Sequence, residues 1–237
     1  SIIDAAKENI AKVPEMKELD NTSRDLLPVL SEMKTLTDQM TAYYGDGNYF
    51  KNKTLREEMH VNFLETAKKY RVLSKKFKEA FSSRSKEQKR KFAEKIKKEG
   101  KLIEYDLMTF IDSCEEILDE IQREKISAEN LTDADLAKFK ELEAKMTASM
   151  DKLKNSAENQ EMLKKEHYHS SDFTSFLLYT ERFKETVAKF INRVENKEKL
   201  DPKLLQNNPS LKNESGTPEN VFHEYNELIK EYNKIAK

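Results

Sequence analysis

The amino-acid sequence predicts an all-α fold, an elongated antiparallel bundle of about six to seven helices, several of them long. Between residues 48 and 201 the chain has a single glycine, Gly100, and no proline. Glycine and proline are the strongest breakers of regular structure, so this run predicts long helices joined by very short turns. Apolar residues recur there every three to four positions, which is the period of an amphipathic helix. No alternating strand pattern occurs in the sequence.

The composition favours a narrow helical protein over a disordered chain. Charged residues make up 37% of the sequence and the mean hydropathy is -0.87, but the net charge is only -1. Disorder requires low hydrophobicity together with high net charge, and the second condition fails. We therefore expect a single helical-bundle domain over residues 1–237, with wide polar faces on its helices and a long loop at about residues 199–217.

The N-terminal third of the chain predicts three helices. A short amphipathic helix over residues 1–17 ends or bends at Pro14. Cap-forming residues at 20–23 favour the start of a second helix, which runs to about residue 44 and tolerates Pro28 only in its first turn. The glycine-rich residues 45–48 form the clearest turn of the chain, and a third helix is expected from about residue 51 to residue 81.

The longest helix is expected in the middle of the chain. Residues 82–85 predict a break, because Ser85 and Gln88 fit a capping box that opens a new helix. This fourth helix should reach about residue 125. Gly100 lies inside it and predicts a weak point or kink that costs about 1 kcal/mol relative to alanine.

The C-terminal half predicts three further helices. Thr132 and Asp135 fit a second capping box and open a helix that fades after residue 157. The polar residues 170–172 open another helix, which runs to about residue 194. Thr217 followed by Pro218 predicts the N-cap and first residue of the last helix, which ends near residue 235.

The charges are divided between two neighbouring segments. Residues 68–101 hold fifteen lysines and arginines against four acidic residues, and residues 104–124 hold eight acidic residues against one arginine. Two interpretations stay open: hydrated helix faces, or a basic patch for an anionic surface such as lipid headgroups, a polyphosphate polymer or nucleic acid. The near-zero net charge disfavours a specific nucleic-acid partner. The candidate patch residues are Lys75, Lys76, Arg84, Lys86, Lys89, Arg90 and Lys91.

Aromatic side chains gather around the glycine-rich turn. The chain has twelve phenylalanines and nine tyrosines, and most of them lie in the apolar stripes, which is where core residues are expected. The residues near the turn break this pattern, so they either cap the end of the bundle or line a small pocket. They are Tyr43, Tyr44, Tyr49, Phe50 and the nearby His60.

The sequence contains no signature of catalysis. It has no zinc-ligand spacing, no glycine-rich phosphate loop and no nucleophile motif. His167 and His169 are two positions apart, so a helix would point them in nearly opposite directions, and Cys114 lies in an apolar stripe that predicts burial. We therefore expect no catalytic residue, no cofactor and no metal. An enzyme with a site near the aromatic turn or the histidine pair is the disfavoured alternative.

Three short runs of the sequence resemble one bacterial family. They are residues 40–52, MTAYYGDGNYFKN, followed by His60, and the closing runs 221–226, VFHEYN, and 231–233, EYN. These runs are similar to the YiiG-like putative lipoproteins, which carry a domain of unknown function. The resemblance implies an all-helical domain that is exported and tethered by a lipidated cysteine. Residue 1 is a serine and no signal segment follows it, so we expect that cysteine and a signal peptide to precede Ser1.

These observations lead to one functional expectation and one alternative. We expect a non-catalytic binding or structural protein of the bacterial cell envelope, an extracytoplasmic lipoprotein anchored to the membrane. Its partner would be another envelope protein or an anionic surface. The alternative is a cytoplasmic helical adaptor that binds a partner protein through its charged faces. No segment approaches the roughly 18 apolar residues that a transmembrane helix needs.

Overall fold

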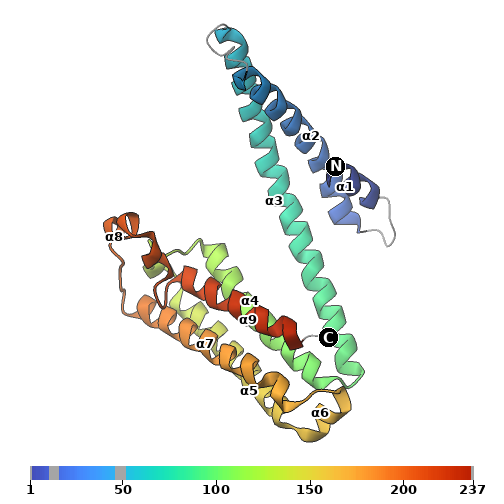
Figure 1. Ribbon diagram of the computed structural model, residues 1–237, viewed down its shortest axis with the longest axis vertical. Coiled ribbons are helices and arrows are strands. Elements are labelled where there is room, and N and C mark those ends of the chain that lie inside the picture. The colour runs from blue at the N-terminus through green and yellow to red at the C-terminus, as the bar shows by residue number, and fades with distance from the viewer. Residues whose placement is uncertain (1, 11–15, 46–51, 236–237) are drawn as a thin grey trace. The chain divides into compact units, whose positions relative to one another are not determined.

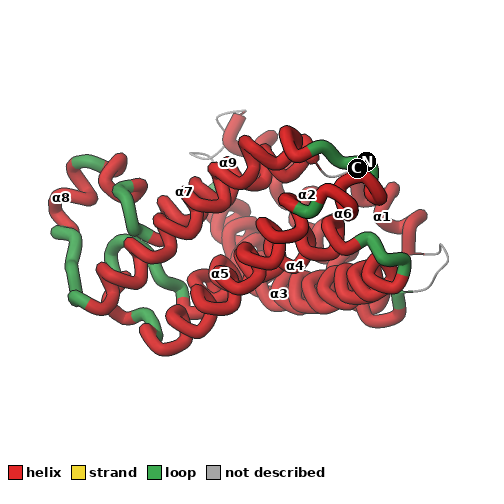
Figure 2. Tube along the Cα trace, turned by 90° about the horizontal axis from the view of Figure 1, so that it is seen from below, coloured by secondary structure: helices red, strands yellow, loops and turns green. Residues whose placement is uncertain are grey.

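A computed structural model describes residues 2–10, 16–45 and 52–235 of the chain (Figure 1). Within these ranges every regular element is helical and no strand occurs (Figure 2), so the all-α prediction is confirmed. The described residues form nine α-helices, against the six to seven that the sequence predicted. They are α1 (Ile2–Ile10), α2 (Lys17–Gly45), α3 (Lys53–Lys98), α4 (Leu102–Glu124), α5 (Leu136–Glu158), α6 (Gln160–Glu166), α7 (Ser170–Glu195), α8 (Pro202–Asn207) and α9 (Pro218–Ile235).

The chain packs into two compact units. Unit 1 covers Ser1–Lys91 and unit 2 covers Phe92–Lys237, so the boundary falls inside α3. The single domain over residues 1–237 stays a prediction. None of the helices in the described ranges is long and apolar enough to cross a bilayer.

Unit 1 buries little apolar surface. Its helix α1 packs against α2, and its buried apolar side chains keep 7–8% of their surface accessible. A core residue of a larger domain is commonly buried more completely than this. Unit 1 is therefore held by a thin apolar contact surface. The buried apolar residues in the described part of unit 1 are Leu26, Leu27, Val29, Tyr43, Met59 and Ala80.

Pro28 lies in the interior of α2, whereas the sequence predicted that it would lie in the first turn of this helix. The helix begins at Lys17 rather than after residue 23, so Pro28 lies well beyond the first turn. A proline removes one backbone hydrogen bond and crowds the preceding turn, at a cost of about 3 kcal/mol. Leu26, Leu27 and Val29 around it are buried, and this packing holds the helix through the proline.

The break between the third and fourth predicted helices was placed wrongly. The structure continues α3 through residues 82–85 and ends it at Lys98, and the chain then turns at Gly100 with a φ of 71°. Serine inside a helix costs only a fraction of what glycine costs, so a serine cluster alone does not end one. A positive φ costs glycine nothing, and this is why the turn falls at Gly100.

Four helices surround the core of unit 2. Helix α4 contacts α5 and α9, and α7 contacts the same two helices, so the four form a closed ring of contacts. Aromatic rings meet edge to face between these helices, Phe110 with Phe176 at 6.1 Å and Phe139 with Phe190 at 5.0 Å. The fully inaccessible side chains of this core include Phe110, Cys114, Met146, Phe176, Phe183 and Phe190.

Short helices occupy the segments between the long ones. The expected loop at residues 199–217 contains α8 and a 3₁₀ helix, η3 (Pro209–Asn213), which contacts α9. The predicted N-cap of the last helix is confirmed, since Thr217 Oγ1 accepts a hydrogen bond from the Asn220 backbone at 3.2 Å. The cap of α5 is Asp135 itself, which accepts from Lys138 at 3.1 Å, and Thr132 lies in a 3₁₀ helix, η2 (Leu131–Asp133).

Candidate functional site

The basic segment of the sequence lies on one long helix face. Lys75 is nine residues from the buried Thr66, which is about two and a half helical turns. Lys75 therefore projects from the side of α3 opposite Thr66. Five other basic residues follow the same side at steps of three, four or eight positions. We call this set the basic stripe, and it comprises Lys68, Arg71, Lys75, Lys78, Lys86 and Lys89, all exposed except the half-buried Lys89.

Little in the described structure neutralises this stripe. The sequence between residues 68 and 91 contains eleven lysines and arginines but only two acidic residues, Glu79 and Glu87. Lys68, Arg71 and Lys78 have no ion-pair partner in the described part of the chain, and Lys75 reaches Glu79 at 3.8 Å with both side chains exposed. Exposed pairs of this kind contribute about 0–1 kcal/mol. Lys68, Arg71, Lys75 and Lys78 thus keep most of their positive charge for the solvent, whereas Lys86 and Lys89 each have a partner.

The structure divides the seven candidate patch residues into three groups. Lys75, Lys86 and Lys89 belong to the stripe, and Lys76 and Arg90 are exposed beside it. The remaining two, Arg84 and Lys91, are ion-paired within α3 and are described below. Three stripe residues were missed when the patch was defined from the sequence, and they are Lys68, Arg71 and Lys78.

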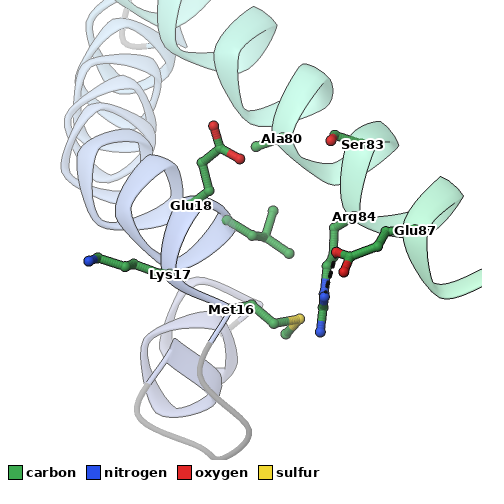
Figure 3. A pocket seen from close by; sticks show the side chains of 8 residues that line it. Met16, Lys17, Glu18, Ala80, Ser83, Arg84 and Glu87 are labelled. Atoms are coloured by element: carbon green, nitrogen blue, oxygen red, sulfur yellow. Dashed lines mark hydrogen bonds and ion pairs between the residues drawn. The ribbon is translucent and has the colours of Figure 1, made fainter. Parts of the chain in front are cut away.

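Arg84 and Lys91 are held by the same carboxylate. Glu87 accepts from Arg84 at 2.7 Å and from Lys91 at 2.5 Å, at helical spacings of three and four. Hydrogen bonds from Lys91 and, to a smaller extent, from Arg84 lower the pKa of Glu87 to about 2. Arg84 and Glu87 border a cavity of about 190 Å³, with Met16 at the start of α2 across from them (Figure 3). These two cations therefore serve the local structure of α3.

The acidic segment on α4 is used within unit 2. Glu116 binds Lys145 of α5 at 2.6 Å, and Glu115 accepts from the Tyr225 hydroxyl of α9 at 3.0 Å. Glu120 is paired with Arg123, whose hydrogen bond lowers the pKa of Glu120. The other acidic residues of this segment also have partners. Glu124 accepts from the Asp135 backbone, Asp106 accepts from Ser156, Glu104 pairs with Lys101, and neither Asp112 nor Asp119 is without a partner.

Two tyrosines of the aromatic turn lie in the described residues. Tyr43 is buried and its hydroxyl donates to the Asn52 carbonyl at 2.6 Å, which ties the end of α2 to the start of α3. Its ring meets that of Tyr44 edge to face at 5.4 Å, and Tyr44 is exposed. His60 lies exposed on α3, and Tyr49 and Phe50 lie outside the described residues. The cap or pocket at this turn stays a prediction.

The histidine pair and the cysteine show no arrangement for chemistry. His167 ends α6 with a φ of 59°, His169 precedes α7, and both are exposed. No group of three metal-ligating side chains occurs in the described ranges. Cys114 is buried as expected, and burial, with the charge of Glu115 second, raises the pKa of its thiol well above the usual value. A thiol in this environment is a poor nucleophile.

A carboxylate from α6 caps the first turn of α4. Glu166 accepts hydrogen bonds from the Ile103 and Glu104 backbones at 3.0 and 3.2 Å, and Lys165 Nζ donates to the Gly100 carbonyl at 3.1 Å. Beneath them, burial raises the pKa of Tyr168 to about 12, with the charges of Glu104 and Glu166 adding to the effect. Sequence spacing gave no signal for this contact, because its partners are more than sixty residues apart.

Comparison with models of protein families gives a match. A family model described as "Protein of unknown function (DUF3829)" matches residues 1–234, which is nearly the whole chain. No curated protein and no solved structure matches the chain.

Proposed function

Because the chain belongs to the DUF3829 family of proteins of unknown function, we propose a role from its structure. The protein is a non-catalytic binding protein of the bacterial cell envelope, and it holds an anionic partner against the basic stripe of α3. The single observation that carries this proposal is the contrast between two charged segments. The acidic residues of α4 are engaged within the fold, whereas Lys68, Arg71 and Lys78 of the basic stripe have no partner among the described residues and Lys75 has only an exposed one.

The location in the envelope is supported by the sequence resemblance. The runs at residues 40–52 and 221–233 are similar to the YiiG-like putative lipoproteins. On this proposal a lipidated cysteine precedes Ser1 and anchors the protein outside the cytoplasm.

The finer architecture is part of the same proposal. The ring of contacts among α4, α5, α7 and α9, joined by short connections, is the arrangement expected of antiparallel neighbours in a helical bundle.

A cytoplasmic adaptor is a second candidate, and one observation favours it. Val61 and Leu64 are 52% and 46% exposed on α3, and exposed apolar side chains beside charges are common where proteins bind one another. The start of the full-length gene separates the two candidates. A signal peptide followed by a cysteine ahead of Ser1 supports the envelope protein, and its absence supports the adaptor.

The anionic partner can be tested with heparin, a sulfated polyanion that requires no knowledge of the natural ligand. In one variant Lys68, Arg71, Lys75 and Lys78 are replaced by glutamine, which keeps a high helix propensity. In a matched control Lys152, Lys164, Lys199 and Lys203 are replaced by glutamine. These four are exposed and have no ion-pair partner among the described residues, so both variants lose the same charge.

The expected result is that the wild-type protein and the control elute from a heparin column at similar salt concentrations. The stripe variant should elute at a clearly lower salt concentration, because fewer counterions are exchanged when it binds. Equal elution of the two variants would contradict the proposal, since retention would then follow net charge and not the face of α3.

A further inference from the structure

We infer that the partner of the basic stripe is the surface of an anionic phospholipid bilayer. This inference rests on the proposed function and names the partner of the same surface. It starts from the shape of the stripe. Leaving aside Lys86 and Lys89, which have partners, the charges run from Lys68 to Lys78 over ten residues of one uninterrupted helix (Figure 1), which corresponds to roughly 15 Å. The stripe is therefore a long, narrow row of charges, suited to a flat surface and too long for a single small anion.

Exposed apolar side chains lie in line with this row of charges. Leu64 is four residues before Lys68 and Val72 is four residues after it, so all three share one side of α3. Leu64 is 46% exposed and Val72 is 58% exposed. A helix that lies on a bilayer presents such a mixture, because its apolar side chains enter the boundary of the acyl chains while its cations meet the phosphates.

The apolar residues distinguish a bilayer from a soluble polyanion. A polyphosphate chain or a DNA duplex offers phosphates but no apolar layer for Leu64 and Val72. A single-stranded nucleic acid is bound through aromatic side chains on which bases stack. The described aromatic residues among residues 68–91 are Tyr70, Phe77 and Phe81, and none of them is a member of the stripe face opposite Thr66. Among the anionic surfaces and polymers considered, only the phospholipid bilayer matches both the charges and the apolar side chains.

The charges determine how strongly the surface should bind. Each lysine or arginine close to an anionic leaflet strengthens binding roughly fivefold, and the effect is lost beyond a Debye length. Loss of four stripe cations should therefore weaken binding by tenfold at the least, even when only part of the stripe touches the surface. The two apolar side chains should add a smaller contribution that resists salt, because burial of apolar surface does not depend on ionic screening.

The test is sedimentation of the protein with vesicles. One set contains equal parts of phosphatidylglycerol and phosphatidylcholine, and the other contains phosphatidylcholine alone. The proteins are the wild-type chain, the glutamine variant of Lys68, Arg71, Lys75 and Lys78, and the matched control altered at Lys152, Lys164, Lys199 and Lys203. A fourth protein carries Leu64→Gln and Val72→Gln. Circular dichroism verifies that every variant is helical, and binding is measured at low and at high salt.

The expected result is binding to the phosphatidylglycerol vesicles and not to phosphatidylcholine alone. The stripe variant should lose about tenfold or more in apparent affinity, whereas the control should stay within about twofold. The variant of Leu64 and Val72 should bind several-fold more weakly, and its remaining binding should be more sensitive to salt than that of the wild-type protein.

Three outcomes would overturn the inference. The first is equal binding of the stripe variant and the wild-type protein to the anionic vesicles. The second is equal binding of the wild-type protein to both kinds of vesicle. The third is retention on heparin, or binding to long-chain polyphosphate or duplex DNA, without binding to anionic vesicles. In the third case the proposed anionic partner stands and only its identification as a bilayer fails. If the wild-type protein bound neither heparin nor anionic vesicles, the proposed function itself would be wrong.

Discussion

Unit 1 and unit 2 use charged side chains in different ways. In unit 2 the acidic residues of α4 bind Lys145 and Tyr225 on neighbouring helices, and Glu166 caps the first turn of α4. In unit 1 the described ion pairs join residues three or four positions apart on the same helix, as Glu87 does with Arg84 and Lys91. The first arrangement fixes how helices pack. The second leaves the outer face of α3 available to a partner.

The two units also differ in how much they bury. The core of unit 2 contains four phenylalanines with no accessible surface, whereas every buried apolar side chain described in unit 1 keeps 7% or more. Large buried side chains contribute most to stability because their removal loses both transfer free energy and packing. Unit 2 should therefore carry most of the folding stability, and unit 1 should open more readily.

The largest expected effect tests this difference in burial. Phe176→Ala empties a fully buried position in unit 2 that contacts the ring of Phe110, and it should cost about 3–5 kcal/mol of unfolding free energy. Leu27→Ala, at a buried position in unit 1, should cost about 2 kcal/mol or less, because the site is thinly covered and can collapse. Chemical denaturation followed by circular dichroism measures both. An equal cost at the two sites would show that the burial contrast has no energetic meaning.

Two glycines allow a similar comparison of helix ends. Gly100→Ala should cost about 1–3 kcal/mol, because its φ of 71° disfavours a side chain and the new Cβ would lie 2.8 Å from Lys165 Nζ. Gly45→Ala, at the end of α2, meets no atom within 4 Å and has no positive φ. It should be neutral or slightly stabilising, since alanine restricts the unfolded chain. Thermal denaturation of the two variants measures these effects. If Gly100→Ala left the stability unchanged, the positive φ of Gly100 could not explain why the chain turns there.

The cap of α4 tests whether a charged residue in unit 2 is structural. Glu166→Ala should cost about 1 kcal/mol, because two backbone N–H groups lose their acceptor and the helix N-terminus loses a favourable negative charge. Glu161→Ala is the control on the same short helix, since its exposed carboxylate has no partner in the described residues. It should change the unfolding free energy by less than about 0.5 kcal/mol. Similar values for both variants would argue against a capping role for Glu166.

The smallest expected effect concerns Glu87 in unit 1. Its pKa is lowered to about 2, first by Lys91 and then by Arg84. A carboxylate with a lowered folded pKa stabilises the protein above its unfolded pKa, and this contribution disappears as the pH falls toward 2. NMR titration of the side-chain carbon should show the low midpoint in the wild-type protein and a higher one after Lys91→Gln. An unchanged midpoint in that variant would mean that Lys91 does not hold the carboxylate.

The sequence revealed the helices because their apolar stripes are periodic. The predicted helix break at residues 82–85 was wrong, because α3 continues through them. Residues 82–85 offer capping side chains, but four polar residues inside a favourable helix do not end it. The position of Pro28 was also predicted wrongly. Proline strongly disfavours the interior of a helix, but the packing of the buried residues around Pro28 outweighs that preference. The short helices α6 and α8 lack enough residues to show a period, so only the folded chain reveals them.

The misplaced break also concealed the basic stripe. A helix boundary at residues 82–85 would have put Lys78 and Lys86 on different helices with no common face. The charge count found the basic segment, but the stripe required the knowledge that α3 is continuous. The pairing of Arg84 and Lys91 with Glu87 follows from helical spacing alone and could have been predicted. The cap by Glu166 could not, because its partners come from distant parts of the chain.

The central claim is that the charges of the basic stripe serve a partner and not the fold. The most direct test measures unfolding free energy and heparin retention together on the glutamine variant of Lys68, Arg71, Lys75 and Lys78. We predict an unfolding free energy within about 0.5 kcal/mol of the wild-type value and a clear loss of retention. A variant that is markedly destabilised, or one that is retained as strongly as the wild-type protein, would contradict the claim.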